Sequence, residues 1–136
     1  MRNIRNKFFH IYLAGPIQHC DDSECIDWRE QFASNYSHGV CYDPMRRDYR
    51  DNYASRVNEI VLLDKRDIKN SDVMVVGYTR PSSGTAMEIY YAHTLGLPIV
   101  VINDEGLPLS PWILYHATTV TDSLNCAVTW IEENVT

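Results

Sequence analysis

Residues 72–78, with the sequence DVMVVGY, form a near-continuous apolar run. A short apolar run of this kind is typical of a strand buried on both faces, as a central strand of a parallel sheet is. The residues that follow, 79–84, are TRPSSG, and a helical pattern begins at Thr85. The stretch therefore predicts a strand, a short connection and a helix, which is the repeating unit of an α/β fold.

The same alternation extends from this run in both directions. Further strands are predicted at residues 8–14, 38–42, 98–102 and 118–120, and helices at residues 23–36, 53–70, 85–95 and 122–135. Each pair of parallel strands needs a crossover connection, which a helix supplies. We therefore expect a single α/β domain over residues 1–136: a small doubly wound parallel sheet of five strands, flavodoxin-like or Rossmann-like, with helices on both faces.

Composition restricts the partners of the protein. Twelve Lys plus Arg residues stand against eighteen Asp plus Glu residues, which gives a net charge of −6. This balance disfavours a nucleic-acid polymer or an anionic membrane, because phosphates attract the opposite charge. No apolar run approaches the roughly 18 residues that cross a bilayer. Four cysteines without metal-site spacing indicate free thiols in a reducing cytoplasm: Cys20, Cys25, Cys41 and Cys126.

Ligands of doubly wound sheets bind beyond the carboxyl ends of the strands. This rule selects residues 15–22, 43–50 and 78–88 as candidate ligand segments. In the last segment, the hydroxyls of Ser82, Ser83 and Thr85 and the free amides of a helix start form a plausible anion site. The alternative is a capping box from Thr85 to Glu88, in which the Glu88 carboxylate only satisfies the Thr85 amide.

A second carboxylate gives Glu88 another interpretation. Asp64 lies on the apolar stripe of its predicted helix, together with Val57, Ile60, Val61 and Ile68. A carboxylate on the face toward the sheet is desolvated unless it borders a cleft or has a partner. Two such carboxylates at one sheet edge suit acid–base or nucleophilic chemistry. Asp67, further along the helix, fits the pattern of a solvated helix-end aspartate.

A basic cluster follows the second predicted strand. The cluster consists of Arg46, Arg47 and Arg50. These arginines either lie in a solvated loop and pair with the neighbouring aspartates, or they attract an anionic ligand. The aspartates in question are Asp43, Asp48 and Asp51.

Two aromatic residues also have more than one interpretation. Tyr12, near the end of the first strand, is either a packed aromatic or part of the site. Trp112 follows Ser110 and Pro111, which are predicted to begin a turn or helix, and it is either a packing anchor or a subunit contact.

Three motifs in this order resemble the nucleoside 2-deoxyribosyltransferase family, which also contains nucleoside 5'-monophosphate N-glycosidases. They are YLAGP at residues 12–16, Asp64 ahead of DVMVV at 72–76, and SGTAMEIYYA at 83–92. The resemblance implies cleavage of the N-glycosidic bond between base and sugar. It assigns Glu88 as the nucleophile that forms a glycosyl-enzyme ester, Asp64 as the group that protonates the departing base, and Tyr12 as the support of the Glu88 carboxylate. It implies no metal or organic cofactor.

The resemblance also bears on the substrate. Transferases of free nucleosides carry an aspartate where this chain has Ser82, and the monophosphate hydrolases have a phosphate-binding serine near the position of Ser110. Serine at both places implies a hydrolase of nucleoside 5'-monophosphates, with a pyrimidine base favoured by family habit. Further substrate-binding residues are expected at Gly15, Gly84, Arg46 and Arg47.

The family further implies a homodimer or larger oligomer, in which Ser110 completes the site of a neighbouring subunit. Two alternatives stay open for the function. One is a true transferase that exchanges bases, and the other is a non-catalytic nucleotide-binding or sensing module.

Overall fold

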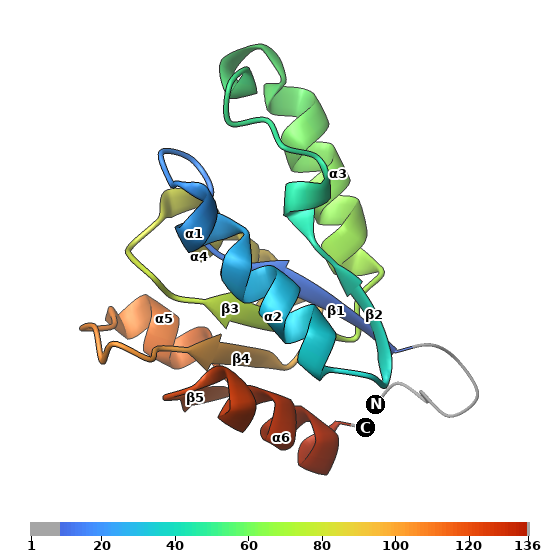
Figure 1. Ribbon diagram of the computed structural model, residues 1–136, viewed down its shortest axis with the longest axis vertical. Helices are drawn as coiled ribbons and strands as arrows, with labels where there is room; N and C mark the ends of the chain where they lie inside the picture. Colours follow the sequence, from blue (N-terminus) through green and yellow to red (C-terminus); the bar gives the residue numbers. More distant parts are fainter. Residues whose placement is uncertain (1–8, 136) are drawn as a thin grey trace.

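The computed structural model describes residues 9–135, and within them the strands form one parallel sheet of order β2-β1-β3-β4-β5 (Figure 1). The strands are β1 (Phe9–Ala14), β2 (Gly39–Tyr42), β3 (Val73–Gly77), β4 (Ile99–Ile102) and β5 (Thr119–Thr121). Each coincides with a predicted strand to within one residue at either end; Phe8, where the first was predicted to begin, lies outside the described residues. The expected α/β class is confirmed.

Helices cover both faces of the sheet, as predicted (Figure 1). On one face, α2 (Asp27–Asn35) and α6 (Leu124–Asn134) pack through Phe32 and Ile131. On the other, α3 (Val57–Lys69), α4 (Ser83–Thr94) and α5 (Pro111–His116) pack through Ile68, Ile89 and Ile113. Three shorter helices complete the chain: α1 (Asp22–Cys25) and the 3-10 helices η1 (Pro44–Arg46) and η2 (Tyr53–Ser55).

The site of ligand binding follows from the strand order. Strand β1 lies between β2 and β3, and Tyr12 of β1 is in register with Met74 of β3. The connection from β1 to β2 passes through α2 on one face, and that from β3 to β4 passes through α4 on the other. Adjacent strands whose connections leave to opposite faces form a topological switch point, where doubly wound sheets bind ligands.

The predicted helix at residues 23–36 is interrupted at Ile26. In a continuous helix, the Cys25 carbonyl would accept a hydrogen bond from the backbone amide of Arg29. Here the Arg29 side chain takes this acceptor, with Nη1 donating to the Cys25 oxygen at 2.5 Å. The helix therefore ends at Cys25, and α2 starts anew at Asp27.

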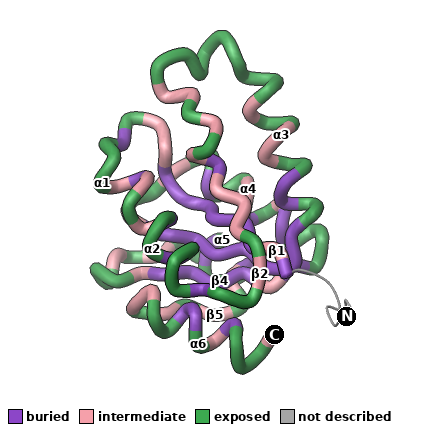
Figure 2. Tube along the Cα trace, turned by 45° about the vertical axis from the view of Figure 1, so that its right-hand side comes forward, coloured by how far each residue is buried: buried purple, intermediate pink, exposed green. Residues whose placement is uncertain are grey.

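The stripe predicted for α3 meets the sheet along only part of its length. Val57 is 55% exposed and Val61 is 47% exposed, whereas Ile68 is buried. Figure 1 shows the reason, since the N-terminal part of α3 extends past the sheet, and Figure 2 shows its residues changing from exposed to buried toward its C-terminal end. Asp64 lies between the two parts, in the last stretch of the helix before the buried end.

Several smaller expectations are also settled. All four cysteines have free thiols, as expected. Trp112 is not a packing anchor, because 70% of it is exposed and its ring stacks on His116 at the surface of α5. Within residues 9–135, none of the helices combines the length and the apolar character that crossing a bilayer requires.

Candidate active site

Glu88 and Tyr12 meet at the switch point. The Tyr12 hydroxyl on β1 donates to Glu88 Oε2 on α4 at 2.5 Å. Tyr12 is buried, and its burial together with the charge of Glu88 raises the pKa of the phenol, so the hydroxyl stays protonated as a donor. The geometry fits a tyrosine that holds a carboxylate in one orientation.

The capping-box alternative for Glu88 is wrong. Helix α4 begins at Ser83, two residues before the predicted start, and its N-cap is Ser82, whose Oγ accepts from the Thr85 amide at 3.3 Å. The Thr85 amide is therefore satisfied by Ser82, which leaves the Glu88 carboxylate to Tyr12.

Burial sets the electrostatics of the two carboxyls. It raises the pKa of Glu88 to about 8, with the negative charge of Asp64 as a further cause, and the hydrogen bond from Tyr12 opposes the rise. It also raises the pKa of Asp64 to about 6, against the lowering effect of Arg47. Between these two values the pair holds one proton. Because Glu88 has the higher pKa, that proton rests on Glu88, and the roles that the resemblance implies, with Glu88 as nucleophile and Asp64 as general acid, require it to move to Asp64.

Arg46 and Arg47 contact the carboxylates of α3. Arg46 Nη2 and Arg47 Nη2 donate to Asp67 Oδ2 at 2.6 and 2.7 Å, and Arg47 Nη2 also reaches Asp64 Oδ1 at 3.5 Å. The expectation that Asp67 is solvated is wrong, since it is only 2% exposed. Its position on the helix turns it toward η1, where the two guanidiniums neutralise its charge. A role of these arginines in substrate binding stays a prediction.

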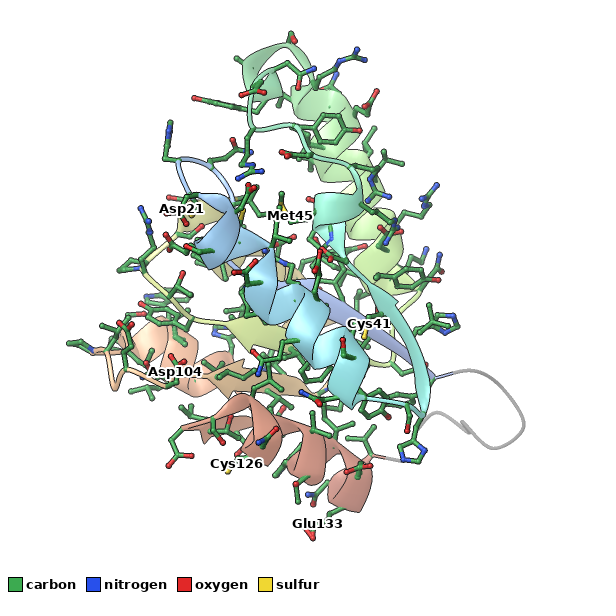
Figure 3. All side chains as sticks on the ribbon, viewed as in Figure 1. Asp21, Cys41, Met45, Asp104, Cys126 and Glu133 are labelled. Carbon is green, nitrogen blue, oxygen red and sulfur yellow. The ribbon has the colours of Figure 1, made fainter. Side chains whose placement is uncertain are left out.

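Arg50 belongs to a separate set of contacts. It donates to Asp48 at 2.8 Å and to Asp22 at 2.7 Å, and its Nη1 bonds the Cys20 carbonyl at 3.0 Å. Asp48 is one of the partners that the sequence suggested. The contacts join the segment after β2 to the segment after β1. In Figure 3, Asp21 and Met45 mark these two segments, and Cys126 and Glu133 mark α6 away from them.

Gly15 is fixed by close packing. A Cβ at this position would lie 2.9 Å from the Gly77 carbonyl and 3.1 Å from Cζ2 of Trp28. No side chain larger than hydrogen fits there without displacing backbone. Close packing thus requires glycine in the turn after β1, independently of any contact with a substrate.

The start of α4 is open. An added Cβ on Gly84 would meet no atom within 4 Å, and Ser83 and Gly84 are exposed. The first amides of a helix have no partner within it and attract anions. Ser110 is the exposed N-cap of α5, where its Oγ accepts from the Ile113 amide at 3.3 Å. Both helix starts offer hydroxyl and amide groups to an anion.

Sequence reasoning missed Arg29. Its side chain is fully buried on α2, and its guanidinium donates to three backbone carbonyls, of Leu13, Gly15 and Cys25. A signal was present, because Arg29 shares a helical stripe with Cys25, Phe32 and Tyr36, all of them buried. The stripe argument that placed Asp64 on the sheet-facing side of its helix also predicts, when it is applied to Arg29, that this arginine is buried.

Metal binding has no support among the described residues, where no three His, Cys, Asp or Glu side chains are grouped to hold an ion.

Comparison with known proteins gives a family and a fold. Residues 11–128 match the sequence profile of the family Nucleoside 2-deoxyribosyltransferase. A 2-deoxyribosyltransferase from Bacillus psychrosaccharolyticus is 19% identical, with a TM-score of 0.71 over 88% of this chain and 90% of that one. A conserved protein from Enterococcus faecalis V583 is 20% identical, with a TM-score of 0.72 over 94% and 99% of the two chains.

A third structure is more distant. The CMP N-glycosidase BcmB from Clostridium botulinum is 15% identical, with a TM-score of 0.58 over 90% of this chain and 98% of that one. At these identities the three structures support the fold alone. A sequence comparison with curated proteins finds no match.

Proposed function

The chain belongs to the nucleoside 2-deoxyribosyltransferase family and is an enzyme acting on the N-glycosidic bond, and from this premise we propose that it hydrolyses nucleoside 5'-monophosphates. The products are the free base and the sugar 5-phosphate. The observation that carries the proposal is the pair of carboxyls at the switch point, with Glu88 held by Tyr12 and the pKa values of Glu88 and Asp64 both raised.

The reaction proceeds in two displacements. The Glu88 carboxylate attacks the anomeric carbon and forms an ester as the carbon–nitrogen bond breaks, and Asp64 gives its proton to the departing base. Water then attacks the same carbon, the ester oxygen leaves as the Glu88 carboxylate, and Asp64 accepts the proton of the water. Two carboxyls in these roles resemble retaining glycosidases, whose transition states are oxocarbenium-like.

The phosphate preference rests on the start of α4. Ser82 stands where an acidic residue would repel a phosphate, and the adjacent amides and the open space at Gly84 can accept one. Like charges at hydrogen-bond distance would disfavour binding strongly. Arg46 and Arg47, although paired with Asp67, also keep positive charge near this edge of the sheet.

We also propose that the functional unit is a homodimer or larger oligomer. Helices α4 and α5 expose large apolar side chains, of which Tyr115 is 75% exposed and Met87, next to Glu88, is 74% exposed; the others are Tyr90, Trp112 and Leu114. An exposed aromatic patch of this kind is typical of an interface. A neighbouring subunit packed there would bring Ser110 to the adjacent site. We also place the protein in the cytoplasm.

The experiment that tests the function is a screen for free base, read by chromatography. Nucleosides and their 5'-monophosphates are incubated separately, beginning with the pyrimidines, each with and without a second free base. We expect base release from a monophosphate, independent of the second base. A new nucleotide that contains the added base would instead identify a transferase. Binding of nucleotides without release of base from any of them would identify a binding module.

A single variant tests the phosphate preference. Ser82→Asp should weaken activity on monophosphates relative to free nucleosides, because it places a carboxylate at the proposed phosphate site. Aspartate is also a good N-cap, so the helix start is retained. An unchanged ratio of the two activities would contradict the phosphate site.

A further inference from the structure

Arg29 is a buried cation bonded to uncharged groups. None of its surface is exposed, and its Nε donates to the Leu13 carbonyl at 3.1 Å while Nη2 donates to the Gly15 carbonyl at 3.0 Å. Its ion-pair contact is with Asp43, whose Oδ1 lies 3.9 Å from Nε, beyond hydrogen-bond distance. Most of the positive charge is therefore not neutralised by a hydrogen-bonded carboxylate.

Such an arrangement is costly. The free energy of removing an ion from water is only weakly offset when its partners are neutral. An apolar side chain of similar volume would pack at lower cost. The three carbonyl contacts satisfy three of the five N–H donors, one on each nitrogen, yet packing alone gives no reason for the charge. The place of Arg29 in the fold gives one.

The guanidinium lies behind the end of β1. The two carbonyls that it holds, of Leu13 and Gly15, come directly after Tyr12 in the chain, and the Tyr12 hydroxyl bonds Glu88 on the opposite face of the sheet. A fixed end of β1 fixes the phenol, and through the phenol it fixes the carboxylate. The positive charge also lowers the pKa of Glu88, against the burial that raises it.

We propose that Arg29 is a positioning residue for the nucleophile: it clamps the end of β1 so that Tyr12 presents Glu88 in one orientation. The inference rests on the proposed function, in which Glu88 attacks the sugar. It assigns no contact between Arg29 and the substrate, from which the backbone of β1 separates it.

The charged groups that face Glu88 and Asp64 come from several different elements. Glu88 faces Tyr12 from β1, Asp64 from α3 and the charge of Arg29 from α2. Asp64 faces Arg47 from the segment after η1, the charge of Asp67 from its own helix and the charge of Arg29 from α2. Arg47 stabilises the anion of Asp64, and the charge of Arg29 stabilises the anions of both Glu88 and Asp64. Because it opposes the rise in the pKa of Glu88, the charge of Arg29 favours the ionised carboxylate that the proposed reaction needs.

The test is a direct titration of Glu88 in the full chain. Carbon-13 NMR of protein labelled at the glutamate side-chain carboxyl follows each glutamate, and Glu88→Gln identifies the signal by its loss. In Arg29→Met, which keeps the volume and removes the charge, we expect the titration midpoint of Glu88 to rise by about one pH unit. Arg29→Lys, which restores the charge, should return it by more than half.

Kinetics give a second readout. The acidic limb of kcat/KM should move to higher pH in Arg29→Met by the same amount as the NMR midpoint, with kcat falling and KM nearly unchanged. A merely structural arginine would lower activity without moving the limb. An unmoved midpoint in a folded Arg29→Met protein overturns the proposal.

If the Arg29→Met variant does not fold, the Asp43→Asn variant tests the proposal instead. Asparagine retains the N-cap of η1, where Asp43 Oδ1 accepts from the Met45 amide at 2.8 Å, and it removes the charge that opposes Arg29. The Glu88 midpoint should then fall, and an unchanged or higher midpoint overturns the proposal. The NMR titration needs no turnover, so a parent protein that releases no base would refute the proposed function alone.

Discussion

Glu88 and Asp64 sit in two differently built regions of the same site. The Glu88 region consists of Glu88, Tyr12 and Arg29, in which a buried phenol and a buried guanidinium support the carboxylate from the sheet side. The Asp64 region consists of Asp64, Arg46, Arg47 and Asp67, in which both arginines reach solvent and Arg47 divides its hydrogen bonds between the two carboxylates.

The difference fits two chemical tasks. A nucleophile acts best when its position is fixed before the substrate arrives, since misplacement by about 1 Å can cost about a hundredfold in rate. A general acid must regain its proton after each turnover, and the partial exposure of Asp64 and Arg46 to solvent allows this. Under the proposed mechanism, the enclosed Glu88 region thus suits a fixed nucleophile, and the more exposed Asp64 region suits proton exchange.

The largest expected effect tests the Glu88 region. Glu88→Ala should lower base release by about a thousandfold or more, because the covalent intermediate is lost. The fold should persist, since the N-cap of α4 is Ser82. Glu133→Ala on α6 is a matched control without an expected effect. A folded variant that releases base at the parent rate would disprove the nucleophile.

Glu88 also makes stability depend on pH. Its pKa is about 8 in the folded protein and 4.5 in its unperturbed state, so folding favours the protonated form. Its contribution is present below pH 4.5 and is lost as pH rises through about 8. The thermal midpoint of the parent should therefore fall across this range relative to Glu88→Gln. Parallel curves for the two proteins would contradict the raised pKa.

The second largest effect tests the Asp64 region. Asp64→Asn should lower kcat by about a hundredfold for natural bases, since general acid catalysis is typically of this size or larger. A monophosphate with p-nitrophenol as leaving group needs no protonation and should lose little. The acidic limb of the pH profile should move to lower pH, because the charge of Asp64 no longer raises the pKa of Glu88. Equal losses for both substrates would contradict the acid role.

A smaller effect separates Asp67 from Asp64. Asp67→Asn weakens the hold on Arg47, which can then pair more closely with Asp64 and lower its pKa. We expect kcat to fall about tenfold, as for an acid whose pKa drops by about one unit. Arg66→Ala is the control, because this partner of Asp67 is exposed and lies 3.5 Å away. Equal kcat values in the two variants would show that Asp67 has no role in catalysis.

The smallest effect tests the open side of the Glu88 region. Gly84→Ala should stabilise the fold by about 0.5–1 kcal/mol, since alanine is favoured in a helix and no atom obstructs it. The same methyl group should raise KM for monophosphates several-fold through contact with the ligand. Gly96→Ala, at a φ of +77°, is expected to destabilise instead. A Gly84→Ala variant with unchanged KM would place the phosphate elsewhere.

The sequence predicted the sheet well, since runs such as residues 72–78 are apolar throughout and strands buried on both faces need this composition. It predicted the stripe of α3 but not where the sheet ends, so Val57 and Val61 were expected to be covered. It offered Thr85 as the cap of α4, whereas the structure uses Ser82, because serine and threonine are both good N-cap residues and composition does not choose between them. Arg29 escaped notice and Asp67 was expected to be solvated, because charged residues are seldom buried.

Tyr12 and Glu88 are 76 positions apart, and the pairing of β1 with β3 lies between them in the fold. Local collapse of a single strand–helix unit cannot bring them together, because the closing contact spans most of the chain. We therefore expect the site to form only after β1 and β3 have paired. During refolding from denaturant, enzymatic activity should return with the slow recovery of tertiary structure and not with the earlier formation of helices.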